Sequence, residues 1–104
     1  MPIYDWDETK PTSNLQKHGL DFLDAPLILE GDHIASTAHP DDAGEARFRA
    51  TGLIFGLSAT VVFTMRGDAY RIISLRPAKA KERNHFHATL HQRRTQGPSG
   101  TEPD

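Results

Sequence analysis

The chain has 104 residues, of which 37% are hydrophobic and 25% are charged, and this size fits one domain with a modest core. It contains no cysteine, which excludes a disulfide scaffold, a cysteine nucleophile and a cysteine-ligated zinc site. The formal net charge of -2 by itself favours no class of partner. No apolar run approaches the length of a membrane span and the first residues do not form a signal peptide, so we expect a cytoplasmic protein with no membrane partner.

The first third of the chain predicts two helices. Thr9 caps a helix that ends at residue 17 or 18, because Gly19 can adopt the left-handed conformation without steric cost. Residues 22–29 carry apolar side chains at helical spacing and predict a second, short helix. Residues 3–6, before both helices, are expected to be a short amphipathic lead-in.

After residue 31 the hydrophobic period changes from helical to alternating, which indicates strands. A polar loop at residues 39–45 separates the first strand from three others, whose short connections predict an antiparallel meander. The four predicted strands are residues 34–38, 46–55, 59–65 and 69–75. Pro77 ends the last strand, and a final helix is predicted from about residue 78 to residue 93.

These elements predict an α+β fold with two N-terminal helices, a four-stranded, mainly antiparallel sheet and a C-terminal helix. We expect residues 1–94 to form a single domain. Residues 95–104 lack large apolar side chains and are expected to be a disordered tail.

The charges are distributed unevenly along this plan. Residues 1–45 hold ten acidic and two basic residues, whereas residues 66–94 hold eight basic and two acidic residues. A basic half beside an acidic half suggests a site for an anion such as a phosphate backbone. The alternative is that both halves are solvated surface and partly neutralise each other.

The last predicted strand carries the most specific local chemistry. Strict alternation of side chains places two sets of residues on opposite faces: Tyr70, Ile72, Ser74 and Arg76 on one, and Arg71, Ile73 and Leu75 on the other. The hydroxyl of Ser74 and the planar guanidinium of Arg76 could then bind one phosphate. Lys79 and Arg83, from the helix that follows, could join them. The alternative is that Arg76 only ends the strand in water.

Two further arginines, Arg47 and Arg49, share one face of the strand predicted at residues 46–55. If this strand neighbours the last strands, the sheet has a basic concave surface. The alternative is that both arginines lie on the solvent-facing side of an edge strand.

Histidine exchanges protons near neutral pH, so His18 is a candidate general acid or base. The alternative is that His18 is a cation that complements the dipole at the end of the first helix. His87 and His91 have the i, i+4 spacing of a metal pair, but no third ligand accompanies them, and no metal is expected. The histidines at positions 33, 39 and 85 have the character of surface residues.

Together these features resemble the BrnT toxins of bacterial type II toxin–antitoxin modules. The matching residues, which span positions 4 to about 86 in the family's order, are Trp6-Asp7-Glu8, Lys10, Asn14, Lys17-His18-Gly19, Phe22, Ala25, Arg47, Gly52, Arg71-Ile72-Ile73-Ser74, Arg76, Ala78, Glu82 and Arg83. The chain departs from the pattern at Pro11, inside the first-helix motif. It also departs at Phe86, where the family often has tyrosine, so no proton transfer by a phenol is assigned there.

The resemblance implies a RelE/ParE-like fold and a metal-independent endoribonuclease that inhibits translation. It also implies a BrnA-like antitoxin, a ribbon-helix-helix DNA-binding protein, so operator DNA would be contacted only through the antitoxin. RNA is cleaved through its own 2′-hydroxyl when a protein moves protons and stabilises charge on the phosphate, so no cofactor is expected. The alternatives are a ParE-like gyrase-binding toxin without nuclease activity and an inactive scaffold that only binds an antitoxin.

With this resemblance we expect six residues at a catalytic site: Lys17, His18, Arg47, Ser74, Arg76 and Arg83. In this hypothesis the three arginines stabilise the phosphate, the serine orients it, and Lys17 and His18 transfer protons. Three further residues are expected to bind RNA: Arg49, Arg71 and Lys79.

Overall fold

The computed structural model describes residues 2–96 and the side chains of residues 2–94. Its elements are β1 (Ile3–Trp6), α1 (Lys10–His18), the 3-10 helix η1 (Phe22–Asp24), α2 (Ala25–Leu29), β2 (His33–Ala38), β3 (Arg47–Ile54), β4 (Leu57–Arg66), β5 (Ala69–Pro77) and α3 (Ala80–Gln96). The tail predicted at residues 95–104 lies outside the described residues, except that residues 95 and 96 extend α3. No helix within the described range is long and apolar enough to cross a bilayer.

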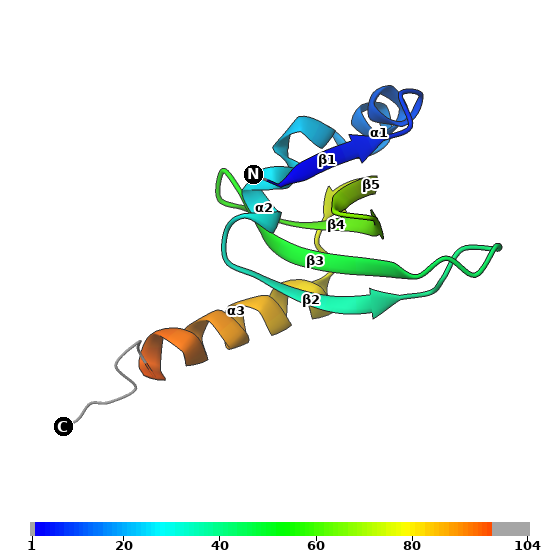
Figure 1. The fold of residues 1–104 in the computed structure, drawn as a ribbon. Helices are drawn as coiled ribbons and strands as arrows, with labels where there is room; N and C mark the ends of the chain where they lie inside the picture. The colour runs from blue at the N-terminus through cyan, green and yellow to red at the C-terminus, as the bar shows by residue number, and fades with distance from the viewer. Residues whose placement is uncertain (1, 97–104) are drawn as a thin grey trace.

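One five-stranded sheet, in the order β1-β5-β4-β3-β2, organises the molecule (Figure 1). Strands β2 to β5 form the antiparallel meander that the sequence predicts. The prediction of four strands is wrong at one edge, because the lead-in is β1, which pairs with β5 in parallel. The ring of Tyr4 stacks on that of Tyr70 with centroids 5.5 Å apart, and this long-range contact has no local sequence signal.

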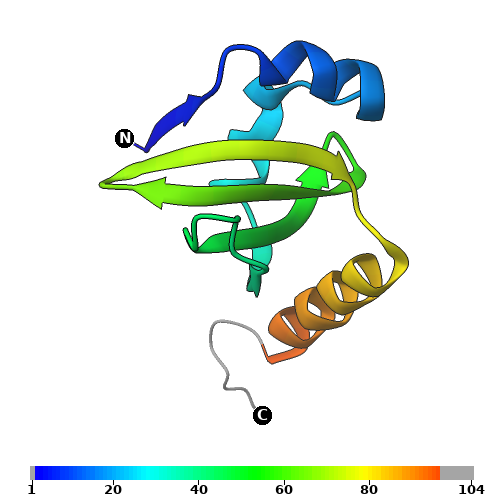
Figure 2. The ribbon, with the colours of Figure 1, turned by 90° about the vertical axis from the view of Figure 1, so that its right-hand side faces the viewer.

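The two faces of the sheet carry different helices (Figure 2). The N-terminal helices supply the main core, in which η1 and α2 bury apolar side chains against the sheet. This core contains Leu20, Phe22, Ala25, Ile28, Leu29, Ala50, Ile54, Ala59, Val61, Phe63, Ile72 and Leu75. Helix α3 crosses the opposite face and buries Phe86 there. Its second half extends away from the body of the molecule (Figure 1).

Helix α1 has the predicted ends, with Thr9 as the N-cap residue and Gly19 at a φ of 72° as the C-cap. The side chain of Asn14 is buried and attaches this helix to the edge of β5 beyond the end of β1. Its amide donates to the carbonyl of Leu75 at 2.8 Å, and its oxygen accepts from the N–H of Leu75 at 3.1 Å. The amide also donates to the carbonyl of Leu20 at 3.0 Å.

The second predicted helix, residues 22–29, is instead two short helices, η1 and α2. Proline at position 26 has no N–H, so it cannot bond to the carbonyl of Phe22 as a continuous α-helix requires. The N–H of Ala25 takes that carbonyl in a tighter 3-10 turn. The side chain of Asp21 caps this turn by accepting from the N–H of Leu23 at 3.0 Å.

The turn between β3 and β4 is tighter than the predicted loop at residues 56–58. It consists of Phe55 and Gly56, with φ angles of 48° and 85°, and β4 begins immediately at Leu57. Two residues with positive φ join antiparallel strands with the twist that a sheet requires. Helix α3 starts at Ala80 rather than at residue 78, because the preceding backbone still bonds to the sheet through the carbonyl of Ser58.

A β-bulge in β5 overturns the predicted alternation of its side chains. Successive β4 residues Val62 and Phe63 pair with Ser74 and Ile72, so Ile73 is an extra residue in β5. Arg71 therefore lies on the same face as Ser74 and Arg76, not on the face of Leu75 as strict alternation predicts. The core side chain of Ile72 correspondingly shares the face of Leu75.

Candidate functional site

The bulge gathers polar side chains from three adjacent strands on the sheet face that α3 crosses. We call this surface the arginine face and define it by Arg47, Arg49, Thr60, Thr64, Arg71, Ser74 and Arg76. Pairing between strands aligns Arg49 with Val62 and then Ser74 in one row, and Thr60 with Arg76 in the next row. The expectation that the arginines of β3 share a surface with the last strand is therefore confirmed.

At one end of the arginine face, an ion pair attaches α3 to the sheet. The guanidinium of Arg76 donates two hydrogen bonds to the carboxylate of Glu82, at 2.8 and 2.9 Å. The same carboxylate accepts from the hydroxyl of Thr60 at 3.0 Å and from the N–H of Lys79 at 2.8 Å. The hydrogen bonds from Arg76 are the main reason that the pKa of Glu82 falls from 4.5 to about 2. Arg76 is thus neutralised by a neighbour that is ionised at neutral pH.

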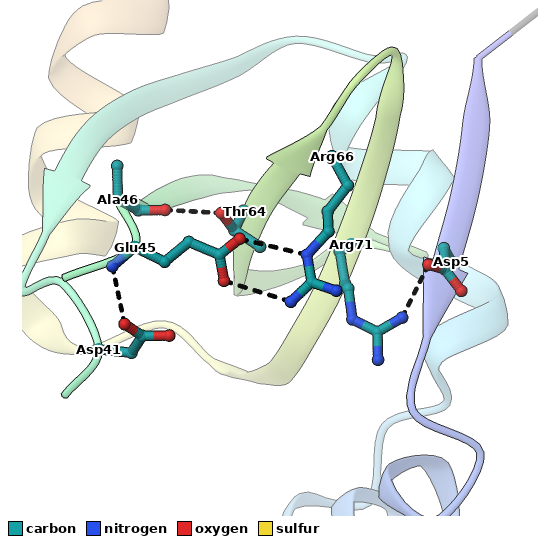
Figure 3. A network of polar contacts seen from close by, with 7 residues as sticks. All are labelled: Asp5, Asp41, Glu45, Ala46, Thr64, Arg66 and Arg71. Atoms are coloured by element: carbon teal, nitrogen blue, oxygen red, sulfur yellow. Dashed lines mark hydrogen bonds and ion pairs between the residues drawn. The ribbon is translucent and has the colours of Figure 1, made fainter. Parts of the chain in front are cut away.

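At the other end of the face, acidic residues from the first half of the chain neutralise two arginines (Figure 3). Arg66 pairs with Glu45 at 3.2 Å, and Arg71 pairs with Asp5 at 2.7 Å. A small pocket of about 160 Å³ lies beside these pairs. Here the two oppositely charged halves of the chain do compensate each other, which is the alternative that the charge distribution left open.

Arg47 and Arg49 make no ion pair with any residue whose side chain the structure describes, although Arg47 lines the small pocket together with Asp7, Asp41 and Glu45. The Nε atom of each arginine is buried and has no hydrogen-bond partner among the described residues. The Nη2 atom of Arg49 donates to the carbonyl of Thr37 at 3.0 Å, which holds its side chain across the face. Buried donors without partners are uncommon in folded proteins, and this distinguishes Arg47 and Arg49 from the paired arginines of the same face.

A groove of about 650 Å³ opens beside Arg49, between α3 and the strands β2 and β3. We call it the α3 groove. Its polar lining includes Ser36, Arg49, Thr51, Lys81, His85 and Arg93. Among the described lining residues Glu82 is the one acid, so the groove is cationic overall.

The structure brings together only some of the residues that the sequence singled out. Helix α1, which carries Lys17 and His18 in its last turn, packs along β5 and away from the edge formed by β2. Within residues 2–94, neither of these two side chains has a hydrogen bond or ion pair with the arginine face. Lys79 and Arg83 are exposed near the start of α3, outside the lining of the α3 groove.

Three residues of the α3 groove, Lys81, His85 and Arg93, were absent from the predicted site. The spacing of Lys81 and His85 is i, i+4, which places both on one side of a helix, and this signal was available in the sequence. The sequence does not show which strands that side of α3 lies against, and the structure shows that they are β2 and β3.

Comparisons with known proteins agree with this architecture. A family model described as the ribonuclease toxin BrnT of a type II toxin–antitoxin system matches residues 6–82. The crystal structure of the Brucella abortus ribonuclease toxin BrnT is similar to this chain, with a TM-score of 0.57 and 31% sequence identity. That similarity covers 76% of this chain and 99% of the Brucella chain. A search of curated proteins found no match.

Proposed function

Since the chain belongs to the BrnT family of ribonuclease toxins of type II toxin–antitoxin systems, we propose that it is an endoribonuclease whose cleavage of RNA inhibits translation. We further propose that a BrnA-like ribbon-helix-helix antitoxin binds and neutralises it. The toxin would then contact operator DNA only through that antitoxin.

The proposed reaction needs no metal, because the attacking group belongs to the RNA. The 2′-hydroxyl loses a proton and its oxygen attacks the adjacent phosphorus, and the bond from phosphorus to the 5′-oxygen breaks as that oxygen gains a proton. The products are a 2′,3′-cyclic phosphate and a free 5′-hydroxyl. The protein assists by stabilising negative charge on the phosphate oxygens and by moving the two protons.

The observation that carries this proposal is that Arg47 and Arg49 share a sheet face and form no ion pair with any side chain that the structure describes. Planar guanidinium groups suit a phosphodiester, because they can donate two parallel hydrogen bonds to its oxygens. Ser74 lies in the same row as Arg49 and is placed to add a hydroxyl donor. Arg76 remains a candidate for the phosphate, although it would have to share its donors with Glu82.

The test compares the wild-type protein with the double variant R47A/R49A on a 5′-labelled RNA transcript of mixed sequence. We expect the double variant to cleave at least about 100-fold more slowly, since each lost charge-stabilising donor costs that order of magnitude. Arg94→Ala is the control, because Arg94 is an exposed arginine in the last turn of α3 and is not part of the arginine face. A chelator should leave cleavage by the wild-type protein unchanged.

Two further measurements address the finer parts of the proposal. A transcript with 2′-O-methyl groups should resist cleavage, and its cleavage at the wild-type rate would exclude attack by the 2′-hydroxyl. Induction in a host should reduce amino-acid incorporation within minutes, and co-expression of the ribbon-helix-helix partner should restore it. Intact transcripts during growth arrest would instead support the gyrase-binding alternative.

A further inference from the structure

The α3 groove has the position and size of a binding site for part of an RNA strand. It lies directly against the arginine face, with Arg49 and Thr51 of β3 at its base and α3 as one wall. Its volume of about 650 Å³ is within the range of pockets that enclose small ligands of nucleotide size. A strand held by Arg49 would therefore continue along α3.

The charge of the groove favours a polyanion. Lys81 and Arg93 project into it from α3 and join Arg49 from the sheet. The carboxylate of Glu82 adds little repulsion, because Arg76, Thr60 and the backbone at Lys79 already satisfy its oxygens. Successive phosphates along a cationic groove are the usual basis of single-strand binding.

The groove also contains an imidazole, the side chain used most often as a general acid or base. Glu82 cannot serve as the base, because its hydrogen bonds hold its pKa far below neutrality. His33 also lines the groove, but it lies at the start of β2 opposite Gly52, and its ring nitrogen already bonds to the carbonyl of Gly31 at 2.9 Å. His85 lies on α3, one turn after Glu82 and on the same side as Lys81, and its ring is exposed to the groove.

We propose, on the basis of the ribonuclease function proposed above, that single-stranded RNA binds in the α3 groove and that His85 is a catalytic residue for its cleavage. With Arg49 on the phosphate, the neutral imidazole of His85 accepts the proton of the 2′-hydroxyl as the oxygen–phosphorus bond forms. The bond to the 5′-oxygen breaks, and a water molecule supplies the proton that this oxygen takes. The imidazolium then returns its proton to solvent.

The test measures cleavage of the same labelled transcript by the variants His85→Gln, His91→Gln and His18→Gln across neutral pH. We expect His85→Gln to reduce kcat about 100-fold or more while KM changes little, as for the loss of a general base. The wild-type rate should rise with pH through the range in which histidine titrates, and this rise should be absent in His85→Gln. The titratable and charged groups that line the groove with His85, and so influence this limb, are His33 from β2, Arg49 from β3, and Lys81, Glu82 and Arg93 from α3.

The outcomes separate the inference from the function on which it rests. His91 is exposed on α3 outside the groove lining, so His91→Gln should cleave like the wild-type protein. If the wild-type protein cleaves RNA and His85→Gln does so at the same rate with the same pH profile, the inference is overturned and the proposed function stands. Loss of activity in His18→Gln but not in His85→Gln would show that His18 of α1 transfers the proton, and it would overturn the role of His85. Absence of cleavage by the wild-type protein would overturn both.

Discussion

The side chain of Asn14 makes the two hydrogen bonds to the backbone of Leu75 that a neighbouring strand would otherwise make. Where β1 ends, the backbone of Leu75 would face solvent or an unsatisfied interior, and the amide of Asn14 satisfies both its N–H and its carbonyl. Amide groups are the one side-chain type with both a donor and an acceptor in this geometry. The position therefore depends on the chemistry of asparagine and not on its size.

Asn14→Ala should lower the free energy of unfolding by about 3 kcal/mol, because it leaves three buried backbone groups without partners. Urea denaturation followed by circular dichroism measures this change through the transition midpoint. Ser13→Ala is the control, since the Ser13 hydroxyl makes only an exposed bond to the carbonyl of Lys10. An equal, small effect of both substitutions would contradict the structural role of Asn14.

The aromatic residue at the β3–β4 turn is the clearest case of local strain. Phe55 has a φ of 48°, and its side chain is 86% exposed, so packing does not offset the strained backbone. Asn-Gly is the preferred sequence for such a turn. Phe55→Asn should therefore raise the free energy of unfolding by about 1 kcal/mol. Gly56→Ala should lower it by a similar amount because of its φ of 85°, and the same urea titration measures both.

At the scale of elements, α3 depends on its polar attachment through Glu82 as much as on apolar packing. Phe86 is its one fully buried side chain among those described, so the helix presents no broad apolar stripe to the sheet. Glu82 compensates by joining Arg76 and Thr60 of the sheet to the first turn of the helix. The placement of the α3 groove follows from this attachment.

The attachment should weaken in acid. Glu82 has a lowered pKa in the folded state, so its stabilisation is complete above the unfolded value of 4.5 and is lost as the pH falls towards about 2. Glu82→Gln should cost about 2 kcal/mol at neutral pH, and the difference from the wild-type protein should shrink over that acid range. Thermal unfolding at a series of pH values measures this, with Glu8→Gln as the exposed control. A difference that is constant with pH would contradict the assignment.

The elements that local chemistry defines were predictable from the sequence, and those that depend on distant segments were not. The cap at Gly19 and the antiparallel meander have local signals, and both are present. The bulge at Ile73 and the pairing of β1 with β5 arise from register between strands, which alternation alone does not reveal. Alternation within one strand places Arg47 and Arg49 on one face, so that feature was predictable. The α3 groove depends on where the helix lies against β2 and β3, so it was not predictable from local pattern.

At the scale of the whole molecule, basic side chains that form ion pairs and described basic side chains that form none lie in different places, although the net charge is only -2. Near the β4–β5 turn, acids of the first half of the chain pair with Arg66 and Arg71. Around the α3 groove, Arg49, Lys81 and Arg93 form no ion pair with any acid whose side chain lies within residues 2–94. The acidic half therefore leaves one part of the basic half available.

This separation predicts different salt dependence for two similar substitutions. If Arg49 contacts a phosphate, Arg49→Ala should reduce the slope of log affinity for a labelled RNA oligonucleotide against log salt by about 0.7. Arg66→Ala should leave that slope nearly unchanged, because Glu45 already neutralises Arg66. Fluorescence anisotropy at several KCl concentrations measures both slopes. Equal slopes for the two variants would show that the RNA does not distinguish these arginines.

The parallel pairing of β1 with β5 also sets the order in which the molecule can be completed during synthesis. The ribosome makes β1 first, but its partner residues begin at Ala69. Until β5 is synthesised, β1 and the side chain of Asn14 cannot form their hydrogen bonds to β5. Translation that stops inside β4 therefore leaves a chain in which neither β1 nor Asn14 is bonded to β5 and which lacks Ser74 and Arg76. Closure of the sheet edge and completion of the arginine face thus occur together, late in synthesis.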